Sequence, residues 1–175
     1  MATSLTTLTG LYNLNGNGSL DVGGTITKSG TTATYTAGEE LGGFKSGSIS
    51  FDASTVDNSA RGDGGWAVNS PGSRSATIEL TWNKLEGDDG QDCLTGMLTQ
   101  ASADWATKGV AIRYQSANGN PTTSGTIIDG FFGVFVPTAY SENQTGGGDA
   151  DGTAVECSMT LASNGEIYSF TQTVS

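Results

Sequence analysis

Two stretches of the chain alternate apolar and polar residues with the two-residue period of a half-buried β-strand. Ile49 and Phe51 alternate with serines and an aspartate, and every second residue from Ala76 to Trp82 is apolar. The same period predicts further strands at residues 110–114, 155–161 and 167–170, with weaker ones at 20–26 and 32–36. Many short strands separated by glycine-rich turns are typical of an antiparallel β protein.

Other segments depart from this alternation. The run from Thr126 to Val136 is apolar on both faces, which predicts a strand buried on both sides. Long polar stretches from Asp57 to Ser73 and from Tyr140 to Gly152 predict loops, the first of them unusually long for a compact domain. The dipeptide Asn164-Gly165 predicts a tight turn, and hence a hairpin formed by the strands on either side of it.

One segment, after residue 88, has the period of an α-helix instead. Asp88 or Asp89 is the expected N-cap, because a carboxylate suits the positive end of the helix dipole. Lys108 in the last turn and Gly109 just beyond it are typical of a helix end. The predicted apolar stripe, which would pack the helix on a sheet, consists of Leu94, Met97, Leu98, Ala101 and Trp105.

Together these elements predict a single domain spanning residues 1–175, which is long enough to bury a core. Its expected fold is mainly β: an antiparallel β-sandwich with one α-helix packed on the sheets and a long inter-strand loop. Residues 1–43 are polar, Gly-rich and weakly patterned, so we expect an N-terminal arm that is ordered by contact with neighbours.

The composition narrows the possible chemistry. The net charge of −11 disfavours gripping nucleic acid or docking on an anionic membrane. The chain has no histidine, so it cannot form a histidine-dependent catalytic triad and lacks the commonest zinc ligand. Cys93 and Cys157 have no metal-binding spacing; a disulfide is possible, but two buried thiols fit the flanking sequence better. We expect a non-enzymatic protein with no cofactor or metal, no signal peptide and no membrane segment.

Several short motifs have a simpler structural interpretation than a functional one. Arg61-Gly62-Asp63 is an integrin-recognition triplet, but in this loop it is better interpreted as a turn. The acidic stretch 149–156 lacks two ligands of a calcium loop, and Trp66 alone makes no sugar platform. Four carboxylates before the helix suggest acid–base chemistry, yet capping the helix explains all of them: Glu86, Asp88, Asp89 and Asp92.

The order of these features, from about Leu41 to Phe170, resembles the major tail tube proteins of long-tailed phages. In that family a Gly-Gly-Trp and Pro-Gly loop often joins two strands, and a short acidic turn and a helix follow. The corresponding segments here are Ser48-Ile49-Ser50-Phe51, Gly64-Gly65-Trp66, Pro71-Gly72, the strand to Trp82, and Asp88-Asp89-Gly90-Gln91.

This resemblance implies a β-sandwich whose inner strands join across six subunits into closed rings, and rings that stack into a hollow tube for genomic DNA. The long loop is then the expected inter-ring contact, through Arg61, Asp63, Trp66 and Pro71, with Trp66 as its anchor. The implied partners are further copies of the chain and the tip, terminator and tape-measure proteins of the tail. The implied location is the virion tail, after assembly in the cytoplasm of a host bacterium.

The acidity of the chain agrees with a bore that double-stranded DNA passes without specific binding, because like charges keep a polyanion from sticking. Closing a ring would also cover sheet edges that otherwise promote aggregation. Glu79, Asp129 and Glu156 lie on predicted strand faces and are the candidate lumen-facing residues.

Three alternatives remain open at this point. A capsid decoration protein or other virion surface protein has a similar composition but no DNA-facing bore. The tube subunit of a contractile injection particle differs mainly in requiring a sheath partner. An extracellular carbohydrate-binding module or glycosidase fragment should show a signal peptide and several exposed aromatic residues, and neither is found.

Overall fold

A computed structural model describes residues 19–36, 38–60, 66–99, 109–116, 125, 127–143 and 155–173. The fold is mainly β and antiparallel, with one helix, as the alternating sequence predicts. The strands are β1 (Ser19–Val22), β2 (Thr25–Ser29), β3 (Thr32–Thr36), β4 (Glu39–Glu40), β5 (Phe44–Asp57), β6 (Asn69–Asn83), β7 (Val110–Gln115), β8 (Ile127–Asn143), β9 (Glu156–Ser163) and β10 (Tyr168–Thr173), and the helix is α1 (Asp89–Thr99).

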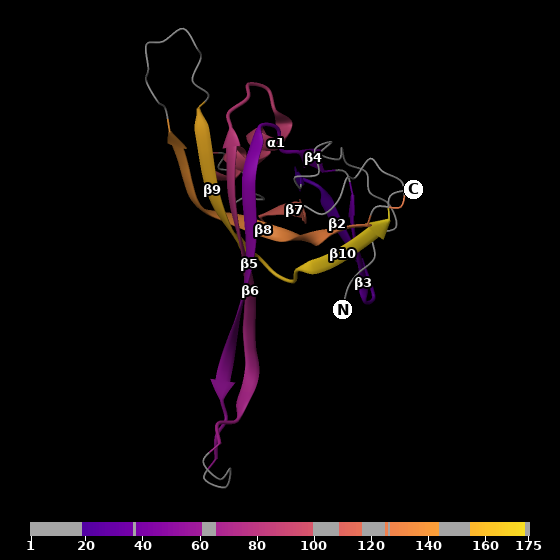
Figure 1. Ribbon diagram of the computed structural model, residues 1–175, viewed down its shortest axis with the longest axis vertical. Helices are drawn as coiled ribbons and strands as arrows, with labels where there is room; N and C mark the ends of the chain where they lie inside the picture. Colours follow the sequence, from indigo (N-terminus) through magenta and orange to yellow (C-terminus); the bar gives the residue numbers. More distant parts are fainter. Residues whose placement is uncertain are drawn as a thin grey trace.

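Eight strands form one sheet in the order β4-β1-β7-β8-β9-β6-β5, with β10 also paired to β8. The long strand β8 joins the two halves of this sheet. Its first half pairs with β7 and β10, and its second half, from Phe135 onward, pairs with β9. A register shift between Pro137 and Ala139 accompanies this change of neighbours. In Figure 1 the first half of β8 and strand β10 lie at a steep angle to the long β5–β6 ribbon.

The main core lies between these two halves of the sheet. Every second residue of β9, and of β6 from Ala76 to Trp82, points into it. The facing strands β1 and β7 contribute their own apolar residues. Strand β8 reaches this core through Phe135 and a second cluster through Phe132, so the prediction of a strand buried on both sides is confirmed for this stretch. Ile127, at the start of the strand, is exposed instead. The buried side chains from β6 and β9 are Ala76, Ile78, Leu80, Trp82, Cys157, Met159 and Leu161.

The second cluster is covered by the β2–β3 hairpin, which forms a separate two-stranded sheet. Ala33 and Tyr35 of β3 pack against Phe132 of β8 and Phe170 of β10. Residues 19–43 therefore contribute directly to the folded domain, because Leu20 of β1 also belongs to the main core. Residues 1–18 lie outside the described ranges.

Helix α1 begins as predicted. Asp88 is the N-cap, since its Oδ1 accepts a hydrogen bond of 2.8 Å from the backbone N–H of Gln91. Leu94 and Met97 are buried in the main core, but Leu98 is exposed, so the prediction that Leu98 belongs to the apolar stripe is wrong. The helix is described only to Thr99; Ala101, Trp105 and Lys108 lie outside the described residues. Among the described residues, no helix has the length and apolar character needed to span a bilayer.

The long loop predicted from Asp57 to Ser73 is wrong in its extent. Strands β5 and β6 remain paired as far as Asp57 and Asn69, so the segment is the distal part of a long hairpin. Pro71 lies within β6, opposite Thr55, rather than in a loop. Because both faces of this ribbon are largely exposed, most of its residues are polar on both sides and the segment shows no alternation.

Two further predictions about the C-terminal half are wrong. The loop expected to start at Tyr140 starts later, because β8 continues to Asn143 while paired with β9. The hairpin expected around Asn164-Gly165 does not form: β9 pairs with β6 and β8, and β10 pairs with β8 alone. Both flanking strands lie along one edge of β8. This strand has 17 residues, which is long enough for β10 and β9 to pair with it one after the other.

Candidate assembly surfaces

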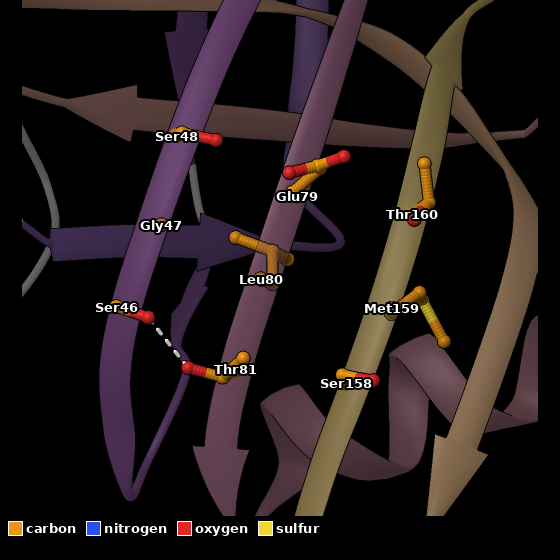
Figure 2. Close-up of a pocket in the computed structure, with 9 residues that line it drawn as sticks. All are labelled: Ser46, Gly47, Ser48, Glu79, Leu80, Thr81, Ser158, Met159 and Thr160. Carbon is orange, nitrogen blue, oxygen red and sulfur yellow. Dashed lines mark hydrogen bonds between the residues drawn. The ribbon is translucent and has the colours of Figure 1, made fainter.

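The layer formed by β5, β6, β9 and the second half of β8 presents one polar face opposite its core face. Along each strand, the residues between the buried apolar ones point to this face. Figure 2 shows part of it, with Ser46, Ser48, Glu79, Thr81, Ser158 and Thr160 across three neighbouring strands. Hydroxyl groups dominate the surface, and Ser46 and Thr81 share a hydrogen bond of 2.6 Å between their side-chain oxygens.

Two of the three predicted lumen residues lie on this polar face. Glu79 is exposed at the middle of β6, and Glu156 at the start of β9 lies opposite Asn83. Glu156 forms an ion pair with Lys45, which no pattern in the sequence predicts. Asp52 of β5 lies on the same side of the sheet by register, opposite Ser75, and was also missed. The charge of Glu156 is therefore largely offset, while Glu79 and Asp52 leave the face acidic.

Asp129 is not brought together with these residues. It lies on the first half of β8, where its strand neighbour is Thr171 of β10. By alternation it shares a face with Phe131, whose ring contacts Phe51 edge-on at 4.8 Å between ring centroids. Asp129 thus belongs to the layer behind the polar face, and its proposed lumen position remains a prediction.

This four-stranded layer has an open edge on each side. Among the described residues, β5 pairs only with β6, and β8 beyond Phe135 pairs only with β9. Unpaired backbone groups on such edges are available to another chain. The strands alternate in direction from β8 through β9 and β6 to β5, so β5 of one copy and β8 of the next would meet antiparallel.

The distal β5–β6 ribbon projects away from the body of the molecule (Figure 1). Local hydrogen bonds hold its end in place. The backbone N–H of Asn58 donates to the carbonyl of Val68 at 2.7 Å, and the N–H of Val68 donates to the hydroxyl of Ser59 at 3.0 Å. Hydrogen bonds from the Ser59 hydroxyl and N–H to the Asp57 carboxylate hold the pKa of Asp57 below its usual value. The ribbon is therefore an ordered projection as far as these residues.

Exposed apolar side chains mark the end of this ribbon. Trp66 is 82% exposed, and Val56 and Val68 are also exposed. Large apolar groups on a projecting element are typical of a contact with another molecule. Of the other predicted inter-ring residues, Pro71 lies within β6, while Arg61 and Asp63 lie outside the described residues.

In the part of the chain that the structure describes, the remaining candidate chemistry has no supporting geometry. Within the described ranges, no three carboxylates or thiols gather as a metal ion would require. Asp88 caps α1, and this role accounts for one carboxylate of the acidic cluster before the helix. Residues 149–151 of the calcium-like stretch lie outside the residues that the structure describes. Cys93 is a half-buried thiol and Cys157 a buried one, and neither is in a disulfide. Burial raises the pKa of Cys93 to about 11, so its thiol is poorly reactive.

The fold is known from solved structures of other proteins. A chain in the sheath/tube terminator of an extracellular contractile injection system (PVC), in its extended state, matches with a TM-score of 0.54 at 16% identity, covering 87% of this chain and 92% of that one. A chain in the six-fold symmetrised baseplate of the anti-feeding prophage matches with a TM-score of 0.53 at 6% identity, covering 87% and 91%.

A third similar chain comes from the tail of an empty gene transfer agent particle with C6 symmetry. Its TM-score is 0.49 at 17% identity, covering 90% of this chain and 97% of that one. No protein-family model matches the sequence, and no curated protein matches it either. At these identities the likeness establishes the fold alone: this chain has a fold that is used in tail-like particles.

Proposed function

We propose that the chain is a structural tube subunit of a phage tail or tail-like particle, in which copies close into six-membered rings and the rings stack. The observation that carries this proposal is the four-stranded layer with a polar face and two open edges. A closed ring of such layers pairs every open edge with a neighbour and leaves no edge exposed. The six-fold symmetrised baseplate that contains a similar fold supports the same symmetry.

In this arrangement the polar face lines the bore, and the core face packs against the rest of the domain. The bore is then rich in hydroxyl groups and carries a modest net negative charge from Glu79 and Asp52, since Glu156 is paired with Lys45. A hydroxyl-rich, weakly acidic wall has few groups that bind phosphate, so double-stranded DNA would pass without specific binding.

The projecting ribbon is the proposed contact between rings. It lies at one end of the long axis and α1 lies toward the other (Figure 1). A head-to-tail contact between unlike ends repeats indefinitely along an axis, as a tube requires. Trp66 would provide most of the buried apolar area at that contact.

We propose a structural role without catalysis, a location in the tail, and contacts with tip, terminator and tape-measure proteins of the same particle.

Negative-stain microscopy of the purified protein at high concentration, with light scattering alongside, tests the proposal. Hollow tubes or six-membered rings of uniform width are the expected result. A protein that stays monomeric or trimeric, even after tail-tip particles are added as a nucleus, would contradict the proposal and favour a capsid decoration protein. Whether a sheath binds the finished tubes would distinguish a contractile particle from a non-contractile tail.

A further inference from the structure

A cleft of about 330 Å³ lies between α1 and the sheet, toward the end of the molecule opposite the projecting ribbon (Figure 1). From the strands it is lined by Trp82 of β6, Tyr140 of β8 and Cys157 of β9. From the helix it is lined by Thr95 and Thr99. The rings of Trp82 and Tyr140 lie 6.2 Å apart between their centroids, so the sheet side of the cleft is mainly apolar.

An exposed leucine forms the lip of this cleft. Leu85 is 48% exposed, and its backbone N–H donates a hydrogen bond of 3.0 Å to the side-chain carbonyl oxygen of Gln91. The side-chain nitrogen of Gln91, a buried residue, donates in turn to the backbone carbonyls of Gly42 and Asn83, at 2.9 Å each. These bonds fix the backbone at Leu85, so the apolar lip is in position before a partner arrives.

Polar groups at the cleft match the indole of a tryptophan. Lys84 and Glu142 form an ion pair of 3.0 Å, and the Tyr140 hydroxyl donates to the Glu142 carboxylate at 3.1 Å. Asp92 of α1 also belongs to the lining. Carboxylate oxygens accept a hydrogen bond from an indole N–H, and a lysine ammonium is attracted to the face of the ring. An aliphatic side chain would use neither group.

Strand β6 joins this cleft to the exposed tryptophan of the ribbon. Trp66 comes just before the first residue of β6, Asn69, and Leu85 comes just after the last, Asn83. The 15 residues of this extended strand span about 50 Å. Trp66 therefore cannot reach the cleft of its own chain, and only another molecule can bring a tryptophan from the ribbon into it.

We propose that the cleft is the socket for Trp66 of a second copy of the chain, in the adjacent ring. This inference rests on the proposed function, because it names the surface that the ribbon contacts when rings stack. The ribbon and the cleft lie toward opposite ends of the molecule, so each ring offers tryptophans at one end and sockets at the other. A tryptophan side chain buries about 150–250 Å² in such a site, and it would cover Leu85 at the same time.

Two matched variants of the full chain test the socket. Leu85→Asp places a charge on the lip, and Leu98→Asp places the same charge on a leucine that is 46% exposed and does not line the cleft. Because both side chains are exposed, urea unfolding should give about the parent stability for each. Leu85→Asp should raise the protein concentration needed for tubes by about 30-fold, as loss of an interface hot spot does, while single rings still form. Leu98→Asp should form tubes at the parent concentration, by sedimentation and negative-stain microscopy.

Cross-linking in assembled tubes tests directly whether the ribbon meets the cleft. Val68 is exposed and close to Trp66 in the chain, so Val68→Cys reports the position of the ribbon end without removing the tryptophan. Combined with Leu85→Cys, it should give covalent dimers and longer chains with a short bis-maleimide. Combined with Ser48→Cys, on the polar face, it should give none. The two native thiols are half-buried and buried, so they add little background.

The outcomes separate this inference from the proposed function. Tubes that tolerate Leu85→Asp, or equal cross-linking by the two cysteine pairs, would overturn the socket and leave the tube subunit standing. Loss of the rings themselves in Leu85→Asp would place the cleft at a contact within a ring, which also overturns the socket. A parent protein that never assembles, even with tail-tip particles added, would overturn both.

Discussion

Thr55 of β5 lies directly opposite Pro71 of β6, on a part of the hairpin where neither strand has a buried residue. Ordered strand pairing therefore continues past the end of the core. Near Pro71, Gly72 allows close approach of the strands, because a Cβ there would lie 2.3 Å from the Ser54 hydroxyl. A ribbon this exposed gains little stability from burial, which is a reason to expect that another molecule covers it.

We predict that Trp66→Ala abolishes or strongly weakens tube formation while the monomer stays folded. The side chain is 82% exposed, so its loss should change the free energy of unfolding by less than about 0.5 kcal/mol. Microscopy and light scattering measure assembly, and urea unfolding measures stability. Trp82→Ala is the contrasting variant: this tryptophan is fully buried, and its loss should cost about 3–5 kcal/mol. Normal tube yield from Trp66→Ala would contradict the proposed role of the ribbon as the contact between rings.

We predict that Glu79→Lys makes assembled tubes retain DNA. The change removes one negative charge and adds one positive charge per subunit on the polar face, and phosphate groups would bind the added ammonium groups. Bound DNA should be measurable by sedimentation with tubes at low salt and should be released as salt rises. Glu86→Lys, an equal charge change on an exposed loop, is the control. Equal DNA retention by both variants would show that Glu79 does not face the bore.

We predict that Gly130→Ala destabilises the fold by about 1–3 kcal/mol through overpacking. Gly130 is buried in β8, and a Cβ at this position would lie 2.1 Å from the backbone carbonyl oxygen of Tyr114 on β7. Urea unfolding followed by tryptophan fluorescence measures the change. Ser48→Ala, at an exposed strand position, should stay within about 0.5 kcal/mol of the parent. Equal stability of all three proteins would mean that β7 and β8 approach less closely than described.

We predict slow thiol labelling in the folded protein. With a pKa of about 11 against an ordinary 9.0, Cys93 should hold about 100-fold less thiolate at pH 8 than an exposed cysteine. Cys157 is fully buried and should react only after unfolding. Disulfide-exchange reagents followed by absorbance measure both rates, and both thiols should react promptly in urea. If one thiol does react fast in the folded protein, loss of that reaction in a Cys93→Ser variant would assign it to Cys93.

The sequence by itself determined the elements that carry a one-sided apolar pattern. The alternation in β6 and β9 and the helical spacing of Leu94 and Met97 predict their type and their buried faces correctly, because in each case one face meets the core and the other meets water. The same reasoning fails for Leu98, which has the helical spacing but is exposed.

The tertiary structure alone decided which strands pair and where the polar face lies. The distal ribbon shows no alternation because both its faces are exposed, so the sequence predicts a loop where the structure has a hairpin. The strands flanking Asn164-Gly165 looked like a hairpin, yet both pair with β8, since a turn sequence fixes a reversal of the chain but not the neighbours of its strands. The Lys45–Glu156 and Asp21–Arg113 pairs join residues far apart in the chain, and only the strand register brings their charges together.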